Sequence, residues 1–325
     1  MAEVSAGGAS LAVRVARKWQ EAAGIVAFEL VAADGGDLPP FTPGAHVDVH
    51  VPGGWRRSYS LCNDAAERHR YQIAVLKEPA SRGGSLGMHE QVQAGDMLTI
   101  DRPRNHFPLD ESAGRSLLLA GGIGVTPLLS MAERLGGRGA DFALHYCART
   151  PQRMAFRRRI EGSAFAARTR LHFDDGPPAQ RLDLAEVLDR SHDTHLYVCG
   201  PKGFMDAVLS QARAAGWPDA QVHHEYFSAE VATQAGDCAF EVKLASSGRV
   251  IPVAHDQSVV QALAGAGIEI PVSCEQGVCG TCLTRVLEGQ PEHRDLYLTP
   301  TEQAANDQFL PCCSRARSAR LLLDL

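Results

Sequence analysis

The stretch "SLLLAGGIGVTPLLSMAERL", Ser116–Leu135, combines three patterns that decide the fold of the middle of this chain. An apolar run is followed by a glycine-rich turn and then by apolar side chains at helical spacing. The apolar face of that helix consists of Leu128, Leu129, Ala132 and Leu135. The stretch therefore predicts a buried strand, a tight turn and an amphipathic helix in succession.

The same pattern returns further along the chain, at "HLYVCGPKGFMDAVLSQARAAG", His195–Gly216. Two more strands are predicted, at "FALHYCART", Phe142–Thr150, and at "QVHHEYF", residues 221–227. Alternating strands and helices indicate a mainly parallel sheet with helices on both faces. Residues 113–229 are therefore predicted to form an α/β domain.

Different patterns flank this middle part. The segments "AHVDVHV", residues 45–51, and "RYQIAVL", residues 70–76, alternate apolar and polar side chains between glycine turns, which predicts an antiparallel β-barrel over residues 1–112. A small, polar linker at residues 228–237 precedes a hairpin and a short helix, so residues 238–325 are predicted to form an α+β domain. A multidomain chain also fits the length of 325 residues.

The composition excludes several classes of function. A net charge of -6 offers no general affinity for nucleic acid. No uncharged run is long enough to cross a bilayer and the first residues lack a secretory signal, so we expect a cytoplasmic protein that does not bind membranes. The nine cysteines, an odd number, then indicate metal or redox chemistry rather than disulfide bonds.

Three cysteines lie close together in "CEQGVCGTC", with Cys274, Cys279 and Cys282 at the spacing CxxxxCxxC. With Cys312 as a fourth ligand, this is the plant-type arrangement for a 2Fe-2S cluster. Glycines in the loop would let it wrap closely around the cluster. A zinc site or a group of free buried thiols would use the same residue type, and both remain open as alternatives.

The segment "PCCSR", residues 311–315, offers two candidates for the fourth ligand. Neighbouring residues on a strand point to opposite faces, so only one of Cys312 and Cys313 is expected to reach the cluster. We predict Cys312.

Two turns are candidates for nucleotide binding. "AGGIGVTP", Ala120–Pro127, would place backbone amides and a helix N-terminus where a pyrophosphate can bind. "VCGP", Val198–Pro201, ends a later strand at the edge where sheets of this kind bind ligands. Glycine in such turns can equally serve packing alone.

The predicted barrel contains two further candidate sites. "RRSYSLCN", Arg56–Asn63, has arginines and hydroxyls suited to a phosphate, and Tyr59 suited to cover a planar ring, although an edge strand with exposed arginines has the same composition. "SRGGS", Ser81–Ser85, could form a phosphate-binding nest or a simple turn. The basic run Arg157–Arg159 is interpreted as a solvated helix face.

Taken together, these motifs resemble the phthalate dioxygenase reductase family and the related vanillate O-demethylase reductases. The likeness runs from "LPPFTPGAHV" through "RRSYSLCND", "RNHFPLD" and "AGGIGVTPLLSM" to "CCSRARS" and "LLLDL". The resemblance implies an FMN-binding barrel, an NADH-binding middle domain and a C-terminal plant-type ferredoxin domain. It also supports Cys312 as the ligand, because relatives have a single cysteine at this place, followed by an aliphatic residue.

The resemblance also implies roles for individual residues. It places FMN against Arg57, Ser58, Tyr59, Ser60, Ala74, Val75, Leu76, Arg82, Gly83, Gly84 and Ser85, with the phosphate at the "RGGS" segment. It places the nicotinamide nucleotide against Gly121, Gly122, Gly124, Pro127, Cys199, Gly200 and Pro201. Thr126 and Phe227 would lie near the isoalloxazine ring, and Cys199 would lie near flavin or nicotinamide.

The family often has an acidic residue near the place where this chain reads "ARTPQR", residues 148–153, so Arg149 and Arg153 leave room for NADPH. We nevertheless predict NADH. The implied protein is a monomeric reductase that passes single electrons to a separate Rieske-type oxygenase and needs no acid–base catalyst. A ferredoxin or flavin reductase that uses FAD, and a redox-sensing iron–sulfur flavoprotein, are the alternatives.

Overall fold

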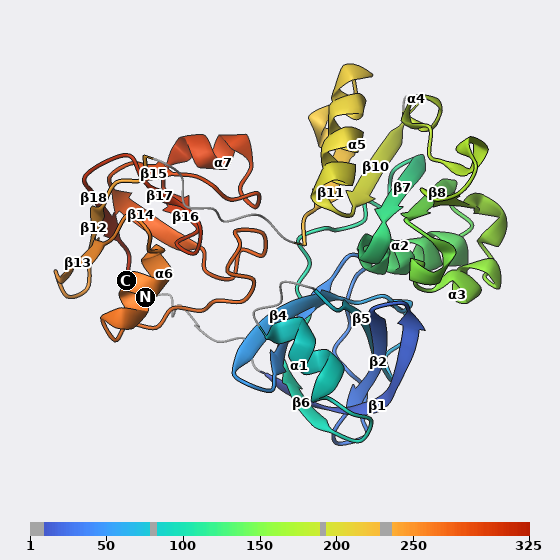
Figure 1. The fold of residues 1–325 in the computed structure, drawn as a ribbon, viewed down its shortest axis with the longest axis horizontal. Coiled ribbons are helices and arrows are strands. Elements are labelled where there is room, and N and C mark those ends of the chain that lie inside the picture. The colour runs from blue at the N-terminus through green and yellow to red at the C-terminus, as the bar shows by residue number, and fades with distance from the viewer. Residues whose placement is uncertain (1–9, 79–82, 189–192, 228–235) are drawn as a thin grey trace. The chain divides into compact units, whose positions relative to one another are not determined.

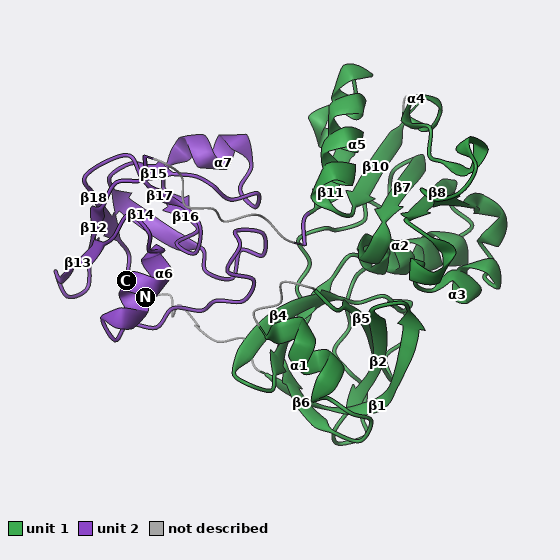
Figure 2. Ribbon diagram, in the orientation of Figure 1, with its two compact units in different colours: residues 1–225 green, residues 226–325 purple. Residues whose placement is uncertain are grey.

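The computed structural model describes residues 10–78, 83–188, 193–227 and 236–325 (Figure 1). The chain divides into two compact units, residues 1–225 and residues 226–325 (Figure 2). The first unit holds two sheets, and the second holds the cysteine motif. The three predicted domain boundaries remain a prediction. No helix among the described residues is long and apolar enough to span a bilayer.

The first sheet is antiparallel, as predicted from its alternating segments. Its strands follow the order β4-β3-β6-β1-β2-β5. The strands are β1 (Leu11–Ala22), β2 (Ile25–Ala32), β3 (His46–Val51), β4 (Trp55–Ser60), β5 (Tyr71–Leu76) and β6 (Met97–Ile100). Helix α1 (Gly84–Glu90) packs on β3, β4 and β5. In the described part of the chain no hydrogen-bonded pairing joins β4 to β5, so the sheet is open where a closed barrel was expected.

The second sheet is parallel and has the order β11-β10-β7-β8-β9. Its elements are β7 (Arg115–Gly121), η1 (Gly122–Gly124), α2 (Val125–Gly137), β8 (Phe142–Ala148), η2 (Pro151–Arg153), α3 (Arg157–Glu161), η3 (Ala166–Arg168), β9 (Thr169–Phe173), η4 (Pro178–Gln180), α4 (Leu184–Val187), β10 (Thr194–Cys199), α5 (Lys202–Ala214), η5 (Asp219–Gln221) and β11 (Val222–Glu225). The strand order reverses between β7 and β10, and both candidate nucleotide turns lie at that point.

The second unit is an α+β fold, as predicted. Its larger sheet has the order β13-β12-β18-β14-β16, and a two-stranded sheet joins β15 and β17. The elements are β12 (Phe240–Leu244), β13 (Val250–Val253), α6 (Val259–Gly265), β14 (Thr284–Glu288), β15 (Pro291–Glu292), α7 (Pro300–Ala305), β16 (Gln308–Phe309), β17 (Arg315–Ala316) and β18 (Arg320–Leu323). A capping box of Ser258 and Gln261 starts α6, and a second one, of Thr299 and Glu302, starts α7.

One hydrophobic core joins the two sheets of the first unit. Ala27 and Ala74 from the antiparallel sheet pack in the same cluster as Leu118, Val125 and Leu128 from the strand and helix of the parallel sheet. Burying each large side chain of this cluster contributes about 1.5–3 kcal/mol. The antiparallel and parallel sheets are therefore held together by burial of apolar surface rather than by a linker.

Polar contacts reinforce this junction. The Ala23 amide donates a hydrogen bond to the Gln152 carbonyl at 2.8 Å, and Glu21 accepts one from the Phe156 amide at 2.8 Å. Phe156 is buried in left-handed backbone conformation, with φ of 58°, which is costly for a bulky residue. The Glu21 carboxylate thus holds a strained turn of the parallel-sheet half against β1.

The interpretation of Arg157–Arg159 as a wholly solvated face is wrong for Arg159. Its guanidinium pairs with Glu133 at 2.9 Å and donates a hydrogen bond to the Gln72 side chain of β5 at 3.1 Å. Arg158 is exposed, and Arg157 pairs with Glu161 one helical turn away. The sequence pattern failed here because the partners of Arg159 are distant along the chain.

The junction predicts an effect on stability at Gly44, which has a φ of +94°. A Cβ atom there would lie 1.9 Å from the Phe107 carbonyl oxygen and 3.0 Å from Met131 of α2. Gly44→Ala is expected to lower the free energy of unfolding of the first unit by about 3 kcal/mol. Urea unfolding followed by tryptophan fluorescence measures this unit, since all three tryptophans, Trp19, Trp55 and Trp217, belong to it.

Gly35→Ala is the matched control, because Gly35 has a φ of +77° with no atom within 4 Å of the added Cβ. Gly35→Ala should lower the free energy of unfolding by about 1 kcal/mol, because only the backbone strain is added. Equal losses in the two variants would contradict the proposed collision.

Candidate functional site

The two candidate nucleotide turns touch through their backbones. A Cβ atom on Gly124 would lie 2.3 Å from the Cys199 carbonyl oxygen, and one on Gly200 would lie 3.0 Å from the Gly121 Cα. These three glycines therefore serve the close packing of the two turns. Gly122 differs, because a Cβ atom there would meet nothing within 4 Å, which leaves its backbone open to a ligand.

Helix α2 begins directly after the glycine turn. Thr126 and Pro127 are buried in its first turn, and the Thr126 hydroxyl donates a hydrogen bond to the Ile123 carbonyl at 3.0 Å. The thirteen residues of α2 give its N-terminus a positive partial charge at the carboxyl edge of the sheet. That edge is chemically suited to a pyrophosphate.

The nucleotide turn also meets the predicted flavin-binding half. Strand β5 contacts η1, and Ala74 shares a core cluster with Val125 while Leu76 and Ile123 pack against it. The fold therefore brings part of the predicted flavin segment, Ala74–Leu76, beside the predicted nicotinamide segment.

Strand β4 separates its predicted flavin contacts onto two faces. The Ser58 hydroxyl donates a hydrogen bond to Asp48 at 2.5 Å, and the neighbouring Arg56 pairs with the same carboxylate at 3.0 Å. Arg57 and Tyr59 lie on the opposite face, because side chains alternate along a strand. The Arg57 guanidinium lies 5.0 Å from the centre of the Trp55 ring.

The two predicted flavin segments of the antiparallel half come together at Trp55 and Arg57. A Cβ atom on Gly83 would lie 2.4 Å from the Trp55 Nε1, and one on Gly84 would lie 2.6 Å from the Arg57 Nε. The Ser85 hydroxyl accepts a hydrogen bond from the Glu78 amide at 3.1 Å. Arg82 lies outside the described residues, so its role remains a prediction.

Asp48, which the sequence analysis missed, organises this strand from behind. Its side chain is fully buried and contacts Ser58, Arg56 and Arg104. Burial alone would raise the pKa of this carboxyl group, but the hydroxyl and the two guanidinium groups together lower it. The charged Asp48 therefore holds Arg56 and Ser58 on one face of β4, opposite the face that carries Arg57 and Tyr59.

Glu225 is a second residue that the sequence analysis missed. It ends β11 beside Cys199 in register, is half-buried, and lies close to the Ser60 hydroxyl. Burial raises the pKa of Glu225 to about 8 against the opposing effect of Ser60, and burial with the nearby Glu225 raises the pKa of the Cys199 thiol. Cys199 is therefore a thiol at pH 7 rather than a nucleophilic thiolate.

An acidic residue at the end of the strand "QVHHEYF", aligned with "VCGP", is the signal that could have identified Glu225. Phe227 lies two residues beyond the end of β11 and is 37% exposed. Because Phe227 falls in the second unit, its predicted place near the flavin ring remains a prediction.

The four predicted ligand cysteines meet in two pairs. The Cys274 thiol forms a hydrogen bond with Cys279, which lowers the pKa of Cys279 to about 6. Cys282 forms a hydrogen bond with Cys312, and this contact raises the pKa of Cys282. Cys279, Cys282 and Cys312 are buried, and Cys274 is half-buried.

This pairing fits a dinuclear cluster, in which each iron takes two thiolates. The described residues contain no group of three or more His, Cys, Asp or Glu side chains arranged to hold a metal ion by themselves. The loop around the thiols has no space for larger residues, since a Cβ atom on Gly280 would lie 2.3 Å from the Tyr297 ring. Its φ of +69° is also one that only glycine adopts readily.

The reason for choosing Cys312 over Cys313 needs correction. Residues 311–313 form a turn, not a strand, so the alternation of side chains along a strand does not apply to them. A Cβ atom on Gly277 would lie 2.4 Å from the Cys313 sulfur, which places this thiol against the ligand loop. Cys312 is nevertheless the one that pairs with Cys282.

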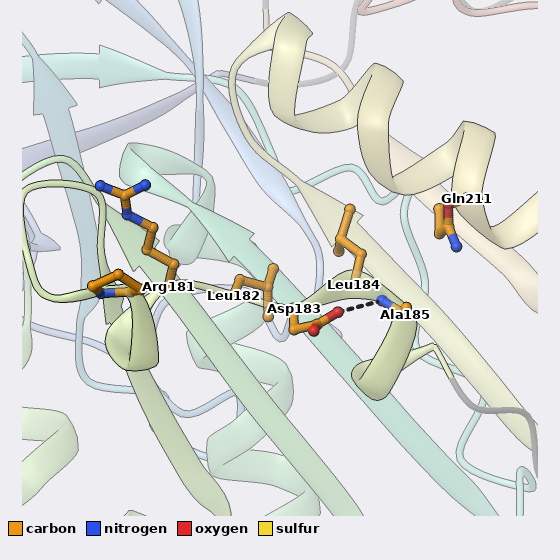
Figure 3. Close-up of a pocket in the computed structure, with 7 residues that line it drawn as sticks. Arg181, Leu182, Asp183, Leu184, Ala185 and Gln211 are labelled. Atoms are coloured by element: carbon orange, nitrogen blue, oxygen red, sulfur yellow. Dashed lines mark hydrogen bonds between the residues drawn. The ribbon is translucent and has the colours of Figure 1, made fainter.

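A hollow with a volume of about 430 Å³ lies elsewhere on the first unit, beside α4 and α5 (Figure 3). Its lining consists of Pro178, Arg181, Leu182, Asp183, Leu184, Ala185 and Gln211. Asp183 caps α4 by accepting a hydrogen bond from the Ala185 amide at 2.9 Å. None of the lining residues is a predicted cofactor contact, so this hollow does not belong to the candidate site.

Two family models match the chain. Residues 118–210 match the oxidoreductase NAD-binding domain, and residues 242–317 match the 2Fe-2S iron-sulfur cluster binding domain. The second match covers all four paired cysteines. It decides for an iron–sulfur cluster over the zinc and free-thiol alternatives.

Similar proteins cover nearly the whole chain. A vanillate O-demethylase oxidoreductase of Pseudomonas putida is 56% identical over 97% of this chain and 99% of its own length. The phthalate dioxygenase reductase of Burkholderia cepacia is 39% identical over 97% of both chains.

Solved structures agree with these sequences. A phthalate dioxygenase reductase, described as a modular structure for electron transfer from pyridine nucleotides to a 2Fe-2S centre, matches with a TM-score of 0.76 over 97% of this chain and 98% of that one, at 39% identity. A self-sufficient cytochrome P450 monooxygenase matches with a TM-score of 0.84 over 97% of this chain and 41% of that one. The chain therefore belongs to the family of phthalate dioxygenase reductases and vanillate O-demethylase reductases, which are oxidoreductases.

Proposed function

We propose that this protein is the NADH-dependent reductase component of a two-component aromatic oxygenase, and specifically of a vanillate O-demethylase. The main support is the pairing of four cysteine thiols, which suits a 2Fe-2S cluster. In the other unit of the same chain, a nucleotide turn contacts a flavin-type sheet. The 56% identity to a vanillate O-demethylase oxidoreductase supports the specific partner.

The residues of the first unit would bind and orient the two nucleotides. Arg57 and the backbone of Gly83 and Gly84 would hold the FMN phosphate, and Tyr59 would cover the ring. Gly122 and the N-terminus of α2 would receive the NADH pyrophosphate. Bound FMN would supply the conversion of a two-electron hydride into single electrons for the cluster.

The carboxyl end of β9 supports NADH over NADPH. Asp174 and Asp175 follow this strand, and their amides donate hydrogen bonds to the Ala148 and Arg149 carbonyls at 3.2 Å. Asp174 and Asp175 would thus supply the acidic residue that "ARTPQR" lacks. A carboxylate at this edge can bind a ribose hydroxyl and repels a 2′-phosphate.

The electron acceptor would be a separate Rieske-type oxygenase. Relatives that are 43–45% identical include reductase subunits of a phthalate 4,5-dioxygenase and of a tert-butanol monooxygenase. We infer a monomer in the cytoplasm, where a reducing environment keeps cluster cysteines available as thiolates.

The function is tested by combining the holoprotein with a purified vanillate O-demethylase oxygenase. NADH oxidation should depend on vanillate and should yield the demethylated acid in proportion. Release of the bound flavin should give FMN, and the finding of FAD would instead favour a ferredoxin-type or flavin reductase. Sustained NADH oxidation without any transfer to the oxygenase would contradict the proposed partner.

The order of electron flow predicts the effect of Cys282→Ser. This variant should retain reduction of the flavin by NADH at a rate within about twofold of the wild type, because Cys282 belongs to the second unit. Reduction of the oxygenase should fall at least about a hundredfold, because the cluster that delivers single electrons would lack one ligand. Anaerobic stopped-flow absorbance separates the two steps.

Cys238→Ser is the matched control, since Cys238 is an exposed cysteine of the same unit. It should leave both rates unchanged. Equal loss of flavin reduction and oxygenase reduction in Cys282→Ser would contradict the proposal that electrons leave the protein through the cluster.

The acidic end of β9 predicts a change of donor preference. The double variant Asp174→Asn with Asp175→Asn should raise kcat/KM for NADPH by about tenfold, which corresponds to the loss of about 1.4 kcal/mol of repulsion. Glu186→Gln, which removes a carboxylate that is 74% exposed in α4, is the control and should leave the preference unchanged. An unchanged ratio of NADPH to NADH turnover in the double variant would contradict binding of the ribose by Asp174 and Asp175.

A further inference from the structure

A fifth cysteine lies within the ligand set of the second unit. Cys313 is 5% exposed and packs in one cluster with Cys282, Leu298, Leu310 and Cys312. The turn at residues 311–313 makes this possible, because the Cys313 amide donates a hydrogen bond back to the Leu310 carbonyl at 3.2 Å. The thiol is therefore held beside the predicted cluster by the backbone.

The contacts of the Cys313 sulfur are few and specific. It lies 3.7 Å from the Leu310 carbonyl oxygen and 3.8 Å from the Ser314 hydroxyl, and it packs in the same cluster as Cys312. On its other side it faces the Gly277 backbone of the ligand loop.

A thiol has one proton, so these acceptors compete for it. The Ser314 hydroxyl donates to Asp295 at 3.3 Å and accepts from the Arg294 amide at 3.1 Å, which occupies much of its capacity. The Leu310 carbonyl is a neutral acceptor at long distance. When Cys312 is deprotonated as a metal ligand, its sulfur is the only charged acceptor among the three, and charged acceptors form the stronger hydrogen bonds.

We propose that Cys313 is a positioning residue of the electron exit, whose thiol donates a hydrogen bond to the ligand sulfur of Cys312 and thereby raises the reduction potential of the 2Fe-2S cluster. The added electron increases the negative charge on the sulfurs, so a donor stabilises the reduced state more than the oxidised state. The proposal rests on the proposed function, because it requires the cluster. Cys313 is not itself a ligand, since Cys274 pairs with Cys279 and Cys282 pairs with Cys312.

The test compares Cys313→Ala with Cys313→Ser in the full-length holoprotein. Anaerobic redox titration, followed by the electron paramagnetic resonance signal of the reduced cluster, gives the midpoint potential. Cys313→Ala removes the donor and should shift the potential to a more negative value. Cys313→Ser keeps a donor of similar size and should restore the potential at least in part.

Cys147→Ala, which removes a thiol of the first unit, is the control and should leave the potential unchanged. An unchanged potential in Cys313→Ala, or equal shifts in Cys313→Ala and Cys313→Ser, would overturn the hydrogen bond. Loss of the cluster in Cys313→Ala but not in Cys312→Ala would also overturn the proposal, because it would show that Cys313 is the fourth ligand. Absence of a 2Fe-2S cluster from the wild-type holoprotein would instead refute the proposed function.

Discussion

The backbone contact between Gly124 and Cys199 is the constraint on which the first unit depends. Hydride transfer requires reacting atoms to approach within about 3–3.5 Å, so a nicotinamide must be held closely against a flavin. The glycine turn packs on the Cys199 carbonyl on one side and contacts β5 on the other. A single turn thus fixes the nucleotide edge relative to the antiparallel sheet, and the shared core beneath it prevents the two halves from separating.

Sequence patterns were sufficient wherever the cause of a structure is local. The strand, turn and helix of Ser116–Leu135, and the cysteine spacing of Cys274–Cys282, follow from neighbouring residues, and the structure reproduces them. Asp48 and Arg159 could not be predicted in the same way. Each owes its role to partners from other strands or helices, which no periodicity along the chain reveals.

The turn at Cys312 shows that the reason given for choosing this ligand was incorrect, while the choice itself stays a prediction. The alternation of side chains applies only to extended backbone, and the Leu310 carbonyl receives the Cys313 amide in a turn instead. Cys312 still reaches Cys282, but Cys313 remains beside it rather than pointing away. Two adjacent cysteines therefore lie at one site, which a count of ligands cannot show.

Burial keeps the three cysteines of the first unit in their protonated form. Desolvation raises the pKa of Cys62 and of Cys147 to about 12, and it also raises that of Cys199, so all three remain thiols at pH 7. Cys279 is different, because the hydrogen bond from Cys274 brings its pKa to about 6. A thiolate is the form that binds metal, so the ligand thiols would release their protons as iron enters.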